Sequence, residues 1–228
     1  MTIALACLIA LTTPAKLEMG IVQLVFFTKP ASPIQMEASE AQKLQTAHLK
    51  FLESLYTTRK ALIVGPLMKA GKYEGLIAID AKSKEEALEL LKQDPWIKRG
   101  AMGLEAYGWY MDKAAPKKAP RFLDLETMWF GFLRRPDDAP TKTEAELQEI
   151  QDGHMANINA MAKSGDLVLA GPIQDKGDFR GVFIFRTKDR KKIEELVARD
   201  PAISSGRLKL ELFQWMTTKG TLPPIQFK

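Results

Sequence analysis

Short apolar runs alternate with amphipathic stretches along this chain and predict a strand, helix, strand, strand, helix, strand order. The apolar run at 21–28 is rich in β-branched and aromatic residues and is closed by a proline, which is typical of a strand. Apolar positions at helical spacing, with His48 on the same stripe, predict a helix after it. The remaining elements are strands at 61–64 and 76–79, a helix from Ser83 to just before Pro95, and a closing strand at 104–111. This βαββαβ order belongs to the ferredoxin-like α+β class.

The same pattern occurs a second time, displaced by 106 residues without insertion. The two histidines, His48 and His154, obey this offset. The other pairs are Gly65-Pro66 with Gly171-Pro172, Gly71 with Gly177, Gly75 with Gly181, Asp94-Pro95 with Asp200-Pro201, Gly100 with Gly206, Glu105 with Glu211, and Trp109 with Trp215. The chain is therefore one module written twice.

The repeat defines the domain organisation. We expect modules at 20–112 and 126–218, a linker at 113–125, a tail at 219–228 and a leading segment at 1–19. Residues 1–18 have no counterpart in the second copy. A module of this size leaves much of its surface exposed, and the second copy is the obvious partner for a bare sheet. We therefore predict that the modules pack sheet against sheet as a pseudo-dimer within one chain, and further homo-oligomerisation stays open.

The amino-acid composition and charge distribution indicate which classes of binding partner to expect. The hydrophobic content of 46% and charged content of 27% are those of a soluble globular protein. The net charge of +5 is spread over scattered basic residues, without the continuous stripe of a nucleic-acid surface. RNA-recognition modules share the βαββαβ order, but the run 180–185 is only a broken version of their aromatic motif. We expect a small-molecule substrate and no nucleic-acid partner.

The leading segment resembles a secretory signal. Residues 3–11 are apolar but too few to span a membrane, and Thr13-Pro14-Ala15 offers a cleavage site. No Lys or Arg precedes the run, in contrast to an ordinary signal. These features favour export slightly over a cytoplasmic location. Cys7, the single cysteine, excludes an internal disulfide and Cys-rich zinc sites.

The candidate chemistry lies on the duplicated histidines. His48 and His154 sit on the apolar stripe of the first helix of each module, where an unpaired imidazole is costly. A core histidine satisfied by one hydrogen bond is the plain interpretation. Retention in both copies while neighbouring positions change favours a function instead. Two histidines in separate modules, without cysteines nearby, do not indicate a metal site.

Asp94 and Asp200 are the candidate partners of these imidazoles. Each precedes a proline at the expected end of the second helix, where punctuation is the plain explanation. A carboxylate is electrostatically misplaced at a helix C-terminus, so we expect another role. An aspartate directed at an imidazole fixes its tautomer for general acid–base catalysis.

The remaining paired residues have mainly structural interpretations. Gly65-Pro66 and Gly171-Pro172 are expected to set a turn after the second strand, in a loop whose glycines suit positive φ angles and which could close a pocket over the helix. Trp109 and Trp215 are typical of core positions. No phosphate-binding loop, nucleotide fingerprint or serine-centred nucleophile motif occurs, so no cofactor is expected.

The ordered set of helix histidine, Gly-Pro, Gly, Asp-Pro and closing aromatic strand, found twice, resembles the YCII (YciI-like) family. The resemblance implies a ferredoxin-like fold paired as a dimeric α+β barrel. It also implies a His/Asp-centred site in each module, His48 with Asp94 and His154 with Asp200. Family members with an assigned reaction include dehydrochlorinases acting on hydroxylated aromatics, and related barrels include muconolactone isomerases and cofactor-free monooxygenases.

The two copies differ in charge in the segment that follows each Gly-Pro motif. Lys69 stands where the second copy has Asp175, and Glu74 stands where it has Arg180. We therefore expect two sites of unequal charge, with Gly65, Pro66, Gly171, Pro172, Asp175 and Arg180 contacting substrate.

The functional hypothesis is a cofactor-independent lyase or isomerase that uses a His/Asp dyad for proton transfer on a small cyclic or aromatic molecule. The alternative is a non-catalytic small-molecule-binding or structural protein whose histidines anchor a ligand.

Overall fold

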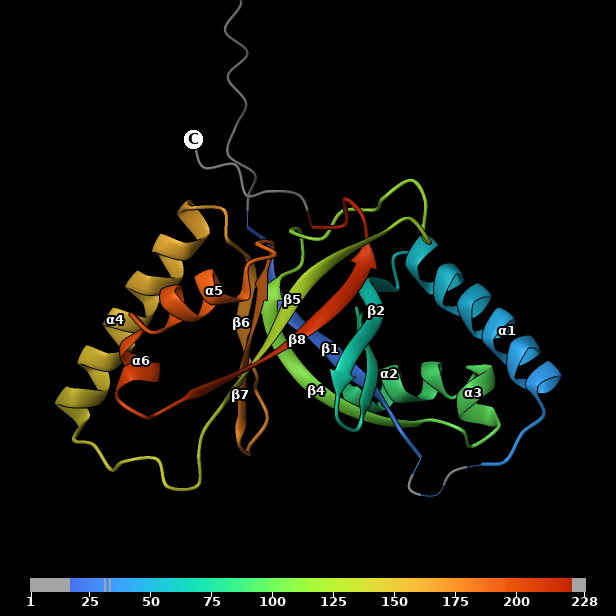
Figure 1. Cartoon of the computed structure of the whole chain (residues 1–228), viewed down its shortest axis with the longest axis horizontal. Coiled ribbons are helices and arrows are strands. Elements are labelled where there is room, and N and C mark those ends of the chain that lie inside the picture. Colours follow the sequence, from blue (N-terminus) through green and yellow to red (C-terminus); the bar gives the residue numbers. More distant parts are fainter. Residues whose placement is uncertain (1–16, 31, 33, 223–228) are drawn as a thin grey trace, which may run out of the picture.

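The structure is a computed structural model that describes residues 17–30, 32 and 34–222. Its strands form a sheet at the centre of the molecule, and its helices lie on two opposite flanks (Figure 1). None of the described helices is long and apolar enough to cross a membrane. The expected signal sequence at 3–15 and Cys7 lie outside the described residues.

Each half of the chain has the predicted order of elements, except that the second helix is divided in two. The first half contains β1 (Met19–Thr28), α1 (Ala38–Thr57), β2 (Ala61–Ala70), β3 (Tyr73–Ile79), α2 (Lys84–Leu91), α3 (Pro95–Lys98) and β4 (Gly103–Asp112). The second half contains β5 (Leu125–Arg134), α4 (Glu144–Lys163), β6 (Leu167–Pro172), β7 (Phe179–Phe185), α5 (Arg190–Val197), α6 (Pro201–Ser204) and β8 (Lys209–Thr218).

All eight strands belong to one antiparallel sheet in the order β4-β1-β3-β2-β8-β5-β7-β6. The two modules join where Leu67 of β2 pairs with Trp215 of β8. The outer strands β4 and β6 also meet, because Trp109 forms an antiparallel bridge with Ile173 just after β6. The sheet is therefore nearly closed, and the predicted intramolecular α+β barrel is confirmed.

Side chains fill the interior of this barrel. Phe26 of the first module packs against both Phe130 and Phe132 of the second, with ring centroids 6.0 and 5.2 Å away. Trp109 and Trp215 are fully buried in the same core, as their sequence pattern predicts. Since both modules contribute to one core, burial of apolar surface holds them together.

The expected turn at Gly65-Pro66 and Gly171-Pro172 is wrong, because both motifs lie within strands, in β2 and β6. These glycines are required by the other module. A Cβ at Gly65 would lie 1.7 Å from the carbonyl oxygen of Met216, and one at Gly171 would lie 2.0 Å from that of Tyr110. Glycine is therefore needed at these two positions, because the backbones of the two modules approach each other too closely there to leave room for a side chain.

The positive φ angles occur later in the same connections. Gly71 has a φ of +64° in the hairpin between β2 and β3, and Gly177 has a φ of +138° before β7. The linker after β4 packs on the first module, since Ala119 is buried and its N–H donates to the Tyr56 hydroxyl at 2.9 Å.

Candidate functional site

Each module contains a histidine hydrogen-bonded to a buried aspartate. His48 of α1 places its Nδ1 2.6 Å from Oδ2 of Asp94, and His154 of α4 places its Nδ1 2.7 Å from Oδ2 of Asp200. Both aspartates are fully buried, and the imidazoles retain only about a tenth of their side-chain exposure, at 10% and 13%. The residues that the sequence pattern paired are therefore in direct contact in both modules.

The aspartates owe their position to helix capping. Asp94 is the N-cap of α3, and its Oδ1 accepts a hydrogen bond from the backbone of Trp96 at 2.9 Å. Asp200 caps α6 in the same way through Ala202, and proline occupies the first turn of each helix. The expectation of a misplaced carboxylate at a helix C-terminus is wrong, because a new short helix begins there. One oxygen caps this helix and the other holds the imidazole.

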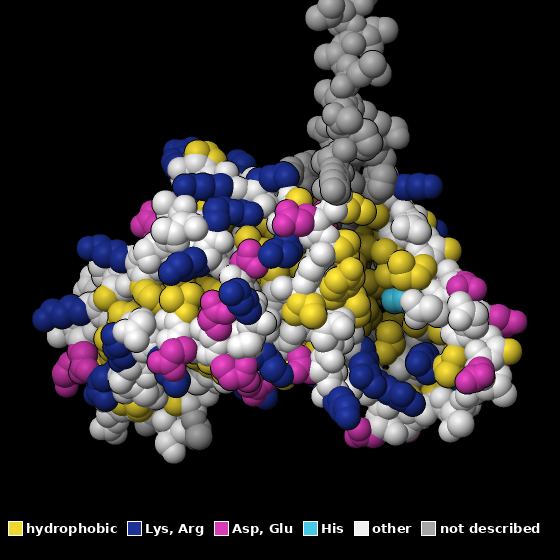
Figure 2. All heavy atoms as spheres, turned by 180° about the vertical axis from the view of Figure 1, so that it is seen from behind, with side chains coloured by type: hydrophobic (Ala, Val, Ile, Leu, Met, Phe, Trp, Pro, Cys, Tyr) yellow, Lys and Arg dark blue, Asp and Glu magenta, His cyan; other side chains and the backbone are white. Residues whose placement is uncertain are grey.

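A cavity of about 500 Å³ lies beside His154. Its wall is formed by α4 and the sheet, with Ile150, Met155, Ile158 and Phe183 among the apolar residues. Figure 2 shows a hollow on the surface with a histidine in it, apolar side chains around it and Lys or Arg side chains along one side. The imidazole is therefore accessible to a small molecule from this cavity.

The equivalent cavity of the first module measures about 430 Å³ and is lined by His48. Leu49 and Leu52 of α1 and Met102 form part of its apolar wall. Phe122 and Leu123 of the linker also line it.

Neither cavity belongs to one module alone. Met19 and Tyr110 of the first module line the cavity of His154, whereas Leu125 and Thr218 of the second line the cavity of His48. Sequence reasoning missed these residues. Met19 and Leu125 occupy equivalent positions and are 45% and 38% exposed, so their repeated apolar character was the available signal.

The sequence model of the YCII-related domain matches residues 24–106 and 128–216, which make up most of the chain. The chain belongs to the YCII-related domain family. The two matched segments correspond to the two modules, in agreement with a tandem duplication. No protein of curated function matches the chain.

Solved structures with the same fold share little sequence with this YCII chain. A haem-binding protein from Thermus thermophilus is 12% identical with a TM-score of 0.54, covering 90% of this chain and 94% of the other. A putative chlorite dismutase is 9% identical with a TM-score of 0.57, covering 87% and 95%. A mutant chlorite dismutase from Candidatus Nitrospira defluvii is 8% identical with a TM-score of 0.58, covering 90% and 92%. At these identities the similarity establishes the fold.

Most of the residues expected to contact substrate line the two YCII cavities. Gly65 and Pro66 line the cavity of His48, and Gly171, Pro172 and Arg180 line that of His154. Glu74 lines the first cavity at the position equivalent to Arg180, so the predicted difference in charge falls at the cavities themselves. Sequence reasoning missed Arg135 and Arg207, which line the second cavity without counterparts of the same type in the repeat.

Asp175 is an exception, because it lies between the modules and does not line the cavity. Its Oδ2 accepts a hydrogen bond from the backbone of Gly108 at 2.7 Å, and its Oδ1 pairs with Lys84. The hydrogen bond between Asp175 and Lys84 raises the pKa of the Lys84 ammonium group. The physical reason is the bridge of Ile173 to Trp109, which draws the segment after β6 toward β4. We therefore correct its assignment from substrate contact to interface contact.

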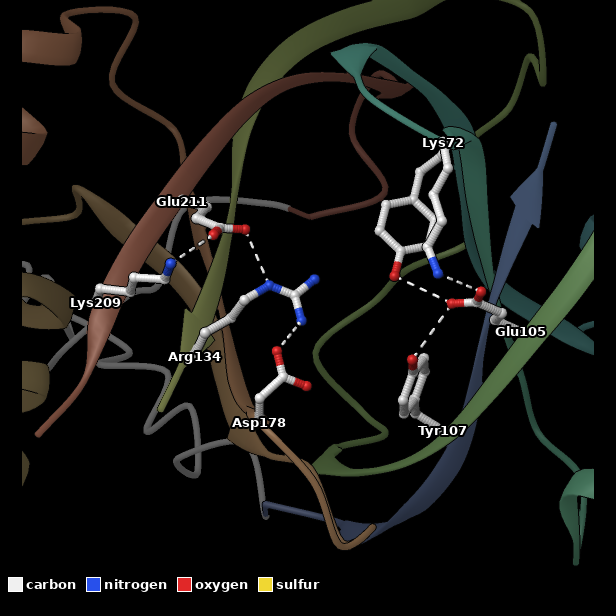
Figure 3. A network of polar contacts seen from close by, with 8 residues as sticks. Lys72, Glu105, Tyr107, Arg134, Asp178, Lys209 and Glu211 are labelled. Atoms are coloured by element: carbon white, nitrogen blue, oxygen red, sulfur yellow. Dashed lines mark hydrogen bonds and ion pairs between the residues drawn. The ribbon is translucent and has the colours of Figure 1, made fainter. Parts of the chain in front are cut away.

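A second polar cluster lies inside the barrel, where charged and phenolic side chains from both modules point toward one another (Figure 3). Arg134 donates to Glu211 at 2.9 Å and to Asp178 at 2.8 Å. On the other side Glu105 accepts hydrogen bonds from Tyr73 at 3.1 Å, from Tyr107 at 3.4 Å and from Lys72. Glu105 and Glu211 are equivalent in the repeat, but they have different partners.

Burial and charge shift the titration of this cluster. Burial, with the neighbouring Tyr73 and Glu105, raises the pKa of Tyr107 to about 12. Burial alone would raise the pKa of Glu105, but the hydrogen bonds from Lys72 and Tyr73 outweigh it and lower that pKa. Burial is likewise outweighed at Asp178, where the hydrogen bond from Arg134 lowers the pKa of the carboxyl group. The contacts of the cluster therefore favour the ionised carboxylates of Glu105 and Asp178 and the neutral phenols of Tyr73 and Tyr107.

The described residues contain no group of three His, Cys, Asp or Glu side chains arranged to hold a metal ion.

Proposed function

We propose that this YCII protein is an enzyme that transfers a proton on a small cyclic or aromatic molecule, as a lyase or an isomerase, with its own side chains as the catalytic groups. The observation that carries the proposal is the 2.7 Å contact of His154 Nδ1 with the buried Asp200 beside a cavity of about 500 Å³. Ligand sites in proteins typically occupy roughly 300–1,000 Å³ and combine apolar walls with few polar groups.

The chemistry follows from the orientation of the imidazole. A carboxylate only accepts hydrogen bonds, so Nδ1 carries the proton and Nε2 holds the free electron pair. With Nδ1 engaged by Asp200, Nε2 is the nitrogen left to react with a molecule in the cavity. It removes a proton from the substrate, and Asp200 stabilises the imidazolium that forms. In an isomerase Nε2 then returns the proton to another atom of the substrate. In a lyase the electrons of the broken C–H bond form a double bond, the leaving group departs with the electrons of its own bond, and the imidazolium passes its proton to the leaving group or to water.

The test combines turnover with hydrogen exchange. The full chain is incubated in D₂O with a panel of aromatic, phenolic and lactone compounds, and NMR follows both product formation and replacement of carbon-bound hydrogen by deuterium. We expect His154→Gln to lower both signals and the double variant His48→Gln/His154→Gln to abolish them while the fold is retained, because each module has a dyad beside a cavity. Gln148→Ala is the matched control, because Gln148 is exposed on the same helix α4 and does not line the cavity. Unchanged turnover in the double variant would rule out the mechanism.

The panel also tests the non-catalytic alternative. Saturable binding in the cavities without exchange or product for any compound would show that the histidines anchor a ligand without transforming it.

A second candidate function, haem binding, rests on the same imidazole. An axial histidine commonly donates Nδ1–H to a carboxylate or carbonyl and binds iron through Nε2. His154 and Asp200 supply this donor set, and His154 would be the ligand. Bound haem would supply redox chemistry. Titration with hemin, followed by the visible absorption band, separates the candidates, since a shifted band lost in His154→Gln supports haem and an unshifted band argues against it.

A further inference from the structure

The charged residues of the two cavities are different, although the cavities occupy equivalent places in the repeat. Arg135, Arg180 and Arg207 line the cavity of His154, and its lining contains no Asp or Glu. The charged residue that lines the cavity of His48 alongside the dyad is Glu74. The second cavity is therefore cationic.

Comparison of equivalent positions in the two modules shows which residues make the charges of the cavities different. Lys29 stands where the second module has Arg135, Glu74 where it has Arg180, and Ala101 where it has Arg207. In the first module Lys29 and Glu74 form an ion pair at 3.5 Å, so the two charges compensate each other.

The arginines of the second cavity lack such compensation. The arginines of that module that form ion pairs are Arg134, Arg186 and Arg190, none of which lines the cavity. Arg135, Arg180 and Arg207 form no ion pair within the described part of the chain, and Arg180 and Arg207 are half-buried. Cationic groups partly removed from water and without a counter-ion attract an anionic ligand more strongly than exposed ones.

We propose that the cavity of His154 binds a small organic acid, with its carboxylate on the arginines and its carbon body against the apolar wall beside the imidazole. A guanidinium group matches a carboxylate through two parallel hydrogen bonds, which is why arginine is the usual residue for this recognition. The apolar residues Ile150, Met155 and Ile158 give the carbon body its contact surface. The cavity of His48 does not share the preference for an acid.

This inference rests on the part of the proposed function that assigns small-molecule binding to the cavities, and it specifies the substrate class of the second cavity. It does not depend on turnover.

Methyl NMR of the full chain locates binding at each cavity separately. Met155, Ile150 and Ile158 report on the cavity of His154, and Met102 and Leu49 report on that of His48. The titrants are benzoate and cyclohexanecarboxylate, benzamide as the uncharged counterpart of benzoate, and inorganic phosphate as an oxyanion without a carbon body.

We expect both carboxylates to shift the reporters of the second cavity saturably. Benzamide should bind at least about tenfold more weakly because it lacks the charge-assisted contact, and phosphate should bind at least about tenfold more weakly because it lacks the apolar contact. Arg180→Gln should weaken benzoate binding by about tenfold, the loss of one charge-assisted pair. Arg121→Gln is the control, because Arg121 is 81% exposed in the linker and lines neither cavity. Glu74→Arg should give the first cavity a response to benzoate.

Three results would overturn the inference. Equal affinity for benzoate and benzamide, an unchanged benzoate affinity in Arg180→Gln, or carboxylate shifts confined to the first cavity would each show that the arginines do not select the ligand. If benzamide alone binds in the second cavity, the substrate class is wrong and the proposed small-molecule site stands. If no compound shifts the reporters of either cavity, the inference and the proposed function both fail.

Discussion

The indole Nε1 of Trp109 donates a hydrogen bond to the carbonyl oxygen of Gly171 in the other module, at 3.2 Å. The equivalent indole, that of Trp215, is equally buried, yet its Nε1 has no hydrogen-bond partner among the described residues. The two contacts between the modules are therefore related by the repeat without being energetically the same.

This asymmetry predicts different costs for the same substitution. Trp109→Phe removes a hydrogen bond and should destabilise the chain by about 1 kcal/mol more than Trp215→Phe, which removes an unsatisfied donor. The free energies of unfolding of both variants are compared by urea denaturation. Equal losses would show that the Trp109 hydrogen bond contributes nothing measurable.

Substitution of Gly171 by alanine should damage the junction between the modules. The added Cβ would meet the backbone carbonyl of Tyr110, which cannot move without displacing β4, so we expect a loss of roughly 3 kcal/mol or more. Gly108→Ala is the matched control, because a Cβ there has its nearest neighbours at 3.6 Å, an ordinary contact distance. Urea denaturation measures both variants, and a Gly171→Ala variant as stable as the control would contradict the close crossing of strands.

Asp200 has two separable roles, which two variants distinguish. Asp200→Asn retains an oxygen for capping α6, so its stability should stay close to that of the parent chain. Its amide donor would face Nδ1 of His154 and reverse the imidazole tautomer. Asp200→Ala loses both contacts and should be less stable by about 2 kcal/mol, from the cap and the unpaired buried imidazole.

Nitrogen-15 NMR of His154 reads the tautomer directly, and chemical denaturation reads the stability. If the tautomer stays the same in Asp200→Asn, the aspartate does not orient the imidazole. The same pair of variants at Asp94 provides an internal replicate in the first module.

The polar cluster of the barrel should make the fold sensitive to acid. The pKa of Glu105 is lowered below its ordinary value of 4.5 by hydrogen bonds from Lys72 and Tyr73 that outweigh burial, and the pKa of Asp178 is lowered below 3.8 by Arg134 in the same way. A depressed pKa in the folded state contributes stability above the ordinary value, and this stability is lost as the pH falls through the folded-state pKa. The free energy of unfolding should therefore decrease as the pH falls below about 5.

Glu105→Gln should show a smaller decrease over the same range, because it removes one of the groups responsible. Glu53→Gln is the control, since Glu53 is exposed on α1. Urea denaturation at a series of pH values compares the slopes. A slope for Glu105→Gln that matches that of Glu53→Gln would show that the cluster does not govern acid stability.

The sequence by itself determined the duplication, the order of elements and the two dyads. Hydrophobic periodicity specifies helices and strands locally, and the repetition of His48 and Asp94 as His154 and Asp200 singles out two pairs of residues that the structure brings into hydrogen-bond contact. The α+β barrel was expected from the family resemblance, and the nearly closed sheet confirms it.

Only the tertiary structure decided how the two modules complete each other. Gly171 faces the backbone of Tyr110, Asp175 bonds to Gly108, and Met19 lines the cavity of His154. These contacts join residues far apart in the sequence, and they depend on where the strands of the two modules meet in the common sheet. No periodicity within one module encodes that junction. The charge of the second cavity also depends on the tertiary structure, because Arg135, Arg180 and Arg207 form one surface only after the chain has folded.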